Sequence, residues 1–105
     1  MTREERAAQI WPLLVFAATN RQLLTYDLVA RMIGVPRPAV GGFLEPIQAY
    51  CLDNELPALT SLVVSDITGL PGTGFIADVD VPKAQAEVFK FDWLDLKAPM
   101  PEDFV

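Results

Sequence analysis

The stretch that decides the fold is TYDLVARMIGVPRPAVGGFL, residues 25–44. Thr25 is expected to cap a helix, because its hydroxyl can accept a hydrogen bond from a free amide of the first turn. Gly34 can adopt the left-handed conformation that ends a helix, and Pro36 lies where that helix cannot continue. A second helix follows from about Arg37, and two helices joined by a short glycine-containing turn form a helix-turn-helix.

Both helices of this motif carry apolar residues at helical spacing. These are Leu28, Val29, Met32 and Ile33 in the first, and Val40, Leu44, Ile47 and Cys51 in the second. Pro46 is expected to kink the second helix or to split it into 37–44 and 46–54. Gly41-Gly42 costs helix stability, which indicates close approach by another helix or by a nucleic-acid backbone; we favour helix packing.

The flanking segments extend the motif into an α+β winged helix-turn-helix. Thr2 and Glu5 predict a capping box and a first helix from Arg3, which Pro12 is expected to kink or divide. After the motif, 59–64 and 73–77 are expected to pair as a β-hairpin wing. A short helix follows Pro82. The predicted domain, with three N-terminal helices, covers 1–94, and 95–105 is expected to be a loosely attached acidic tail.

Charge is divided unevenly along the 105 residues, which carry a net charge of −6. Residues 1–44 hold five arginines against three acids, a net +2, whereas 45–105 hold three lysines against eleven acids, a net −8. Because affinity for DNA depends mainly on neutralising phosphates, only the N-terminal half is a plausible DNA-binding surface.

Composition excludes several classes of protein. No apolar run reaches the length that spans a membrane, so no membrane partner is expected. One cysteine and no histidine rule out an internal disulfide and make a zinc site improbable. No cofactor and no metal are expected, and a reducing cytoplasm is the expected location.

Residues 25–76, about half the chain, resemble the DNA-binding domain of the alkylguanine-DNA alkyltransferases and the related alkyltransferase-like proteins. The resemblance rests on Thr25-Tyr26, Ala30, Gly34-x-Pro36, Ala39-Val40-Gly41, Leu56-Pro57, Val63-Val64 and the glycines from Gly69 to Gly74. The chain is also similar to small bacterial proteins that carry the pattern LPxLTxLVV and a final FDW, a likeness that implies no activity.

The same resemblance argues against catalysis. The family's reactive segment reads proline-cysteine-histidine-arginine before two valines, and this chain has Leu59, Thr60, Ser61 and Leu62 there. Alkyl transfer needs an activated thiolate, which these residues cannot supply. The family's base-replacing arginine falls at Pro38, one residue after Arg37. We therefore expect no enzymatic activity.

Two functions remain open. The first is a non-catalytic regulatory or structure-sensing protein that binds double-stranded DNA, with Arg31 and Arg37 on one exposed face away from the acids. Its expected contact residues are Thr25, Tyr26, Arg31, Arg37, Gly41 and Gly42. The alternative is a winged-helix scaffold that binds a protein partner and not DNA, as the acidic C-terminal half suggests. A homodimer fits either function.

Overall fold

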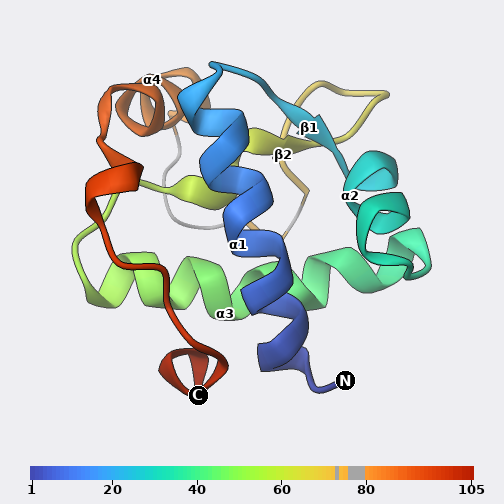
Figure 1. The fold of residues 1–105 in the computed structure, drawn as a ribbon. Coiled ribbons are helices and arrows are strands. Elements are labelled where there is room, and N and C mark those ends of the chain that lie inside the picture. The colour runs from blue at the N-terminus through green and yellow to red at the C-terminus, as the bar shows by residue number, and fades with distance from the viewer. Residues whose placement is uncertain (73, 76–79) are drawn as a thin grey trace.

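Residues 1–72, 74–75 and 80–105 are described by a computed structural model of the chain (Figure 1). The helices are α1 (Arg3–Thr19), α2 (Tyr26–Ile33), α3 (Val40–Asp53) and α4 (Val81–Lys90), and the strands are β1 (Leu24–Thr25) and β2 (Val63–Val64). In Figure 1, α1 crosses in front of α3, with α2 and α4 on opposite sides. This arrangement confirms a mixed domain of helices with one small sheet.

Helix α1 begins with the expected capping box. The Thr2 hydroxyl accepts a hydrogen bond from the Glu5 backbone amide at 3.1 Å, and a Glu5 carboxylate oxygen accepts one from the Thr2 amide at 2.9 Å. These bonds to the carboxylate lower the pKa of Glu5. The helix then runs unbroken to Thr19, so the expected division at Pro12 is wrong. Pro12 is exposed, where its ring displaces no core side chain.

The first helix of the motif ends as expected, but half of its apolar residues face solvent. Gly34 has a φ of 73°, and the Val35 amide donates to the Ala30 carbonyl at 3.0 Å, which closes the helix end. Val29 and Ala30 are buried. Leu28 and Met32 are exposed, so the predicted four-residue inward stripe is only partly correct.

The second helix of the motif is one continuous element. A 3-10 turn, Arg37–Ala39, precedes α3, which runs from Val40 to Asp53 through a buried Pro46. The predicted start near Arg37 therefore holds, whereas the predicted split at Pro46 does not. All four predicted core residues, Val40, Leu44, Ile47 and Cys51, are buried.

The expected hairpin wing is not present in the part of the chain that the structure describes. The segment Leu59–Leu62 is a 3-10 helix, in which residues three apart share one side, so that Leu59 and Leu62 are both fully buried. Strand β2 pairs in parallel with β1, with Leu24 opposite Val63. Residues 74–75 lie outside any strand, and the rest of the expected returning strand, 73 and 76–77, lies outside the described residues.

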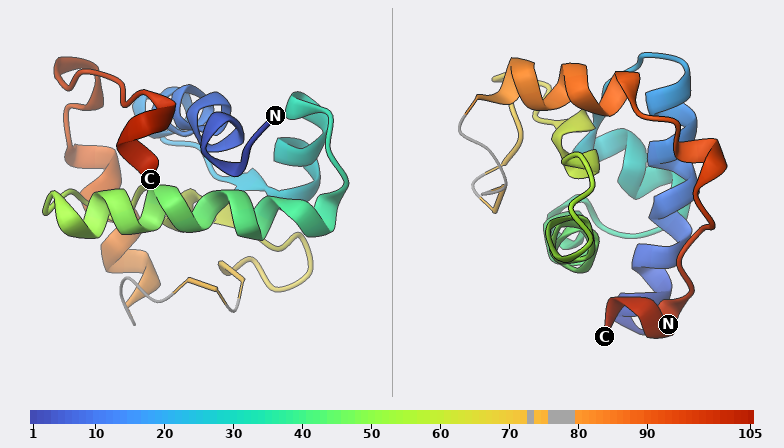
Figure 2. Two further views of the ribbon diagram at one scale, coloured as in Figure 1. Left: turned by 90° about the horizontal axis from the view of Figure 1, so that it is seen from below. Right: turned by 90° about the vertical axis from the view of Figure 1, so that its left-hand side faces the viewer.

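The segment 95–105, expected to be a loose tail, returns along α1 toward the N-terminus (Figure 1; Figure 2, right). A 3-10 turn, Pro101–Phe104, brings Phe104 into the core, where it is 7% exposed. Its ring centroid lies 5.5 Å from that of Tyr50 and 6.2 Å from that of Trp11. The segment is therefore packed against the core through Phe104 and is not a loosely attached tail.

These rings belong to an aromatic cluster formed by Trp11, Tyr50, Trp93 and Phe104. Trp11 meets Tyr50 at 5.6 Å and Trp93 at 5.8 Å, both edge to face, the favoured geometry for ring pairs. The Trp93 indole N–H donates to the Val88 carbonyl at 2.9 Å. Trp93 is thus packed in the core, and the cluster joins α1, α3 and the C-terminal segment.

Within the described residues, no helix has both the length and the apolar character needed to cross a lipid bilayer.

Candidate nucleic-acid interface

A cavity of about 500 Å³ lies beside the N-terminal half of α3. We call this hollow the α3 cavity. It lies between α2, α3, the 3-10 helix before β2 and the segment after β2. Its lining residues are Tyr26, Arg37, Pro38, Gly41, Gly42, Leu44, Glu45, Gln48, Thr60, Gly72, Gly74 and Phe75. Four of the six residues predicted to contact DNA therefore meet at one site: Tyr26, Arg37, Gly41 and Gly42.

The start of α3 is open at this cavity. Gly41 and Gly42 are exposed, and apart from the neighbouring residues and the helix's own backbone no described atom lies within 4 Å of the position that a Cβ would take at either residue. The favoured interpretation of this pair as a helix-packing contact is therefore wrong. The N-cap residue is Ala39, and none of the described side chains caps the helix. The first amides of α3, at the positive end of its dipole, thus remain free of a side-chain acceptor.

Tyr26 forms the opposite wall of the α3 cavity. Its hydroxyl oxygen accepts a hydrogen bond from the Gly72 amide at 2.7 Å. A Cβ at Gly72 would lie 2.7 Å from the same oxygen, so only glycine fits there. Thr25 precedes Tyr26 but does not line the cavity; its hydroxyl accepts from the Leu28 amide at 3.1 Å. Thr25 therefore acts as the helix cap.

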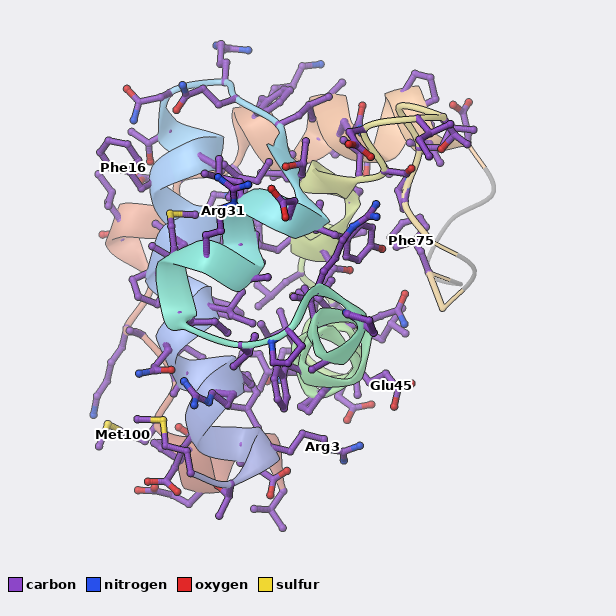
Figure 3. The ribbon with its side chains drawn as sticks, turned by 90° about the vertical axis from the view of Figure 1, so that its right-hand side faces the viewer. Arg3, Phe16, Arg31, Glu45, Phe75 and Met100 are labelled. Carbon is purple, nitrogen blue, oxygen red and sulfur yellow. The ribbon has the colours of Figure 1, made fainter. Side chains whose placement is uncertain are left out.

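Both predicted DNA-binding arginines are paired with acids. The Arg37 Nη2 atom lies 3.3 Å from Asp66 Oδ1, and the Arg31 Nε atom lies 3.0 Å from Asp27 Oδ2. Arg31 does not line the cavity, and Figure 3 shows it on α2, away from Glu45 and Phe75. The expectation of one arginine face free of acids is therefore wrong.

The floor of the α3 cavity carries a hydroxyl that sequence reasoning missed. Thr60 is 4% exposed, and within the described residues its Oγ1 atom has no hydrogen-bond partner. A buried hydroxyl left unpaired costs about 1–3 kcal/mol, and Thr60 is one of the residues that line the cavity. The signal was available in the sequence, since Thr60 and Ser61 interrupt the apolar run LTSLVV.

The remaining polar groups of the cavity include one acid. A carboxylate oxygen of Glu45 lies 3.5 Å from Arg3 Nη1, and Figure 3 shows both residues near the start of α1. The Gln48 side-chain amide donates to the Gly74 carbonyl at 3.1 Å. The cavity therefore combines donors and acceptors with the aromatic rings of Tyr26 and Phe75.

The Cys51 thiol is buried, as its place on the apolar face of the second motif helix predicts. Burial raises the pKa of the Cys51 thiol to about 11, so that it stays protonated at neutral pH and is a poor nucleophile. No group of three or more residues able to hold a metal ion occurs among the described side chains.

Comparison of the chain with protein-family models, with curated proteins and with solved structures found no match in any of the three.

Proposed function

We propose that this chain binds double-stranded DNA without catalysing a reaction, through the α3 cavity and the open start of α3. The observation that carries the proposal is the convergence of Tyr26, Arg37, Gly41 and Gly42 on that cavity. These residues come from α2, from the 3-10 turn Arg37–Ala39 and from the start of α3, and each was expected to contact DNA on sequence grounds.

The start of α3 supplies a site for a backbone phosphate. The N-terminal amides of a helix, aligned with its dipole, bind anions well. The Val40 amide donates to the Arg37 carbonyl, but Gly41 and Gly42 place no side chain over this end of the helix dipole, and the Arg37 guanidinium lies in the turn before them. A phosphate at this position would gain a charge-assisted contact and helix-dipole stabilisation at once.

The cavity behind this phosphate site suits an unstacked base. Its volume of about 500 Å³ falls within the range of pockets that hold small organic ligands. Tyr26 and Phe75 offer rings for stacking, while the Thr60 hydroxyl offers an unused hydrogen bond. Proteins that read a base by extruding it use stacking and edge hydrogen bonds of this kind. The resemblance to alkyltransferase-like proteins favours DNA binding, although Pro38 stands where that family has the arginine that replaces a flipped base.

The test is fluorescence anisotropy of a labelled duplex, with and without an alkylated guanine, at low and moderate salt. Binding that weakens steeply with salt would establish the phosphate contacts. Arg37→Gln should weaken binding. It should also reduce the slope of log affinity against log salt concentration by about one, the value expected for the loss of one phosphate contact. Tighter binding of the alkylated duplex would support a base in the cavity.

A matched control removes one positive charge elsewhere. Lys90 lies in the last turn of α4 and does not line the cavity, so Lys90→Gln should weaken binding less than Arg37→Gln does. Equal effects of the two substitutions would mean that only net charge matters, and the α3 cavity would then not be the interface.

A second candidate function is a protein-interaction module, favoured by a groove beside α1. This groove, of about 390 Å³, is lined by Trp11, Pro12, Val15, Phe16, Thr19, Asn20, Trp93, Leu94, Leu96 and Ala98. Phe16 and Leu94 are exposed there, at 67% and 73%, and Figure 3 shows Phe16 on the side away from Phe75. Large exposed apolar side chains beside a groove are typical of protein contacts.

Light scattering across a concentration series tests the homodimer form of this candidate. A mass that rises with concentration in the parent chain but not in Phe16→Ser would support it, because the substitution removes an exposed ring without disturbing the core. A mass that stays at the monomer value across the concentration series would exclude the homodimer.

A further inference from the structure

The segment after β2 forms a compact loop, residues 65–72, which we call the 65–72 loop. The Ser65 amide donates to the Leu70 carbonyl at 2.9 Å, and the Gly69 amide donates to the Ser65 carbonyl at 2.8 Å. The Ser65 hydroxyl accepts from the Ile67 amide at 3.2 Å. Gly69 has a φ of 71°, which glycine adopts without strain. Local bonds therefore determine the shape of this loop.

Two contacts join the 65–72 loop to the helix-turn-helix. At one end Asp66 Oδ1 lies 3.3 Å from Arg37 Nη2, and at the other end the Gly72 amide donates to the Tyr26 hydroxyl. The left view of Figure 2 shows the loop beside the N-terminal half of α3. Both tethered residues, Arg37 and Tyr26, line the α3 cavity, so the loop contacts the proposed interface at two of its residues.

We propose that Asp66 is an autoinhibitory competitor for phosphate at Arg37. A carboxylate and a phosphate present similar oxygen acceptors to a guanidinium, so Arg37 cannot use the same N–H group for Asp66 and for DNA. Phosphate binding at that N–H thus requires the Asp66 carboxylate to leave, and while the carboxylate stays its negative charge opposes the approach of DNA. This inference rests on the proposed function, and it adds a residue that lowers affinity.

The geometry of the pair makes Asp66 displaceable. The contact joins one nitrogen to one oxygen, and the side chains of Arg37 and Asp66 are 46% and 58% exposed. Exposed single-contact ion pairs are weak. A DNA backbone offers several phosphates and releases counterions on binding, whereas a single free anion offers neither advantage. DNA should therefore displace the Asp66 carboxylate from Arg37, whereas small anions should not.

The experiment measures duplex affinity by anisotropy in the parent chain, Asp66→Asn, Asp53→Asn and Arg37→Gln, and in the Arg37→Gln/Asp66→Asn double variant. Asp53→Asn is the matched control, because it removes one exposed negative charge at the last residue of α3, about 20 Å from the first. Asp66→Asn should tighten binding about two- to fivefold, the range expected for release of an exposed ion pair.

The inference requires that the effect of Asp66 pass through Arg37. Asp66→Asn should tighten binding more than Asp53→Asn in the parent chain, and in the Arg37→Gln background its effect should fall to the size of the Asp53→Asn effect. Equal effects of the two carboxylate substitutions, or an Asp66→Asn effect that persists without Arg37, would overturn the inference.

The outcomes also separate this inference from the proposed function. Binding by the parent chain with no gain from Asp66→Asn would overturn the inference and leave the function intact. Absence of binding by every variant would overturn both. Asp66→Ser serves as a second uncharged variant, with circular dichroism to confirm that each protein is folded.

Discussion

The two ends of α3 differ in how completely their side chains are satisfied. At the C-terminal end Tyr50 packs edge to face against Trp11 and Phe104, and the nearby Trp93 indole donates to a backbone carbonyl. At the N-terminal end Gly41 and Gly42 face open space, and the Thr60 hydroxyl is buried without a described partner. The C-terminal end of α3 thus lies in a well-packed region. Its N-terminal end lies in a region whose polar groups are not all hydrogen-bonded, which is typical of binding sites.

The largest expected effect tests whether the C-terminal segment belongs to the core. Phe104→Ala should lower the free energy of unfolding by about 3–5 kcal/mol, because it removes a buried ring from the aromatic cluster. Urea unfolding followed by circular dichroism measures the change. Val105→Ala is the control, since Val105 is 99% exposed. A loss under 1 kcal/mol for Phe104→Ala would contradict the packed C-terminal segment.

A paired substitution distinguishes the α3 cavity from the rest of the core. Thr60→Val keeps the shape of the side chain but removes the unpartnered hydroxyl, so it should stabilise the fold by about 1–2 kcal/mol. Ser61→Ala removes a second hydroxyl that has no partner among the described residues, outside the cavity lining, and should also stabilise the fold.

Binding separates the two variants. Thr60→Val should weaken binding of the alkylated duplex, whereas Ser61→Ala should leave it unchanged. If both variants, or neither, altered binding, the Thr60 hydroxyl would have no special role in the cavity.

The alkaline stability of the chain tests whether the C-terminal end of α3 stays closed to water. The pKa of the Cys51 thiol is about 11 in the folded chain against about 9 when unfolded, so the unfolded state loses its proton first as pH rises. Between these values the thiol should lower the free energy of unfolding by about 1.4 kcal/mol per pH unit, and it should contribute no pH dependence below pH 8.

Cys51→Ser provides the comparison for this effect, because serine does not ionise in that range. The difference in unfolding free energy between the two proteins should change with pH from about 9 upward. Parallel pH profiles would show that the thiol is solvated in the folded state.

The smallest expected effect concerns the glycines of the motif. Gly41→Ala should stabilise the fold by about 0.5–1 kcal/mol, because alanine favours the helix and nothing described lies near the added Cβ. It should weaken DNA binding by obstructing the amides at the start of α3. Gly34→Ala should instead destabilise the fold, because Gly34 has a positive φ. Destabilisation by Gly41→Ala would mean that the start of α3 is not open.

Local features of the chain were readable from the sequence because each depends on a few neighbouring residues. The capping box of Thr2 and Glu5, the cap at Thr25, the left-handed Gly34 and the buried face of α3 all follow from short-range bonding and helical spacing. The choice of Tyr26, Arg37, Gly41 and Gly42 also rested on the motif alone, and the fold does bring these four to one cavity.

Non-local contacts decided what sequence patterns could not. The run 59–64 has strand-like composition, yet Leu59–Leu62 forms a 3-10 helix whose residues are all buried, and the strand Val63–Val64 pairs with Leu24–Thr25, far earlier in the chain. Phe104 enters the core because Trp11 and Tyr50 leave space for a ring. Likewise, only the folded loop brings Asp66 to Arg37. A local pattern reports the conformation that a segment prefers, whereas the partner that buries it is set by packing of the whole chain.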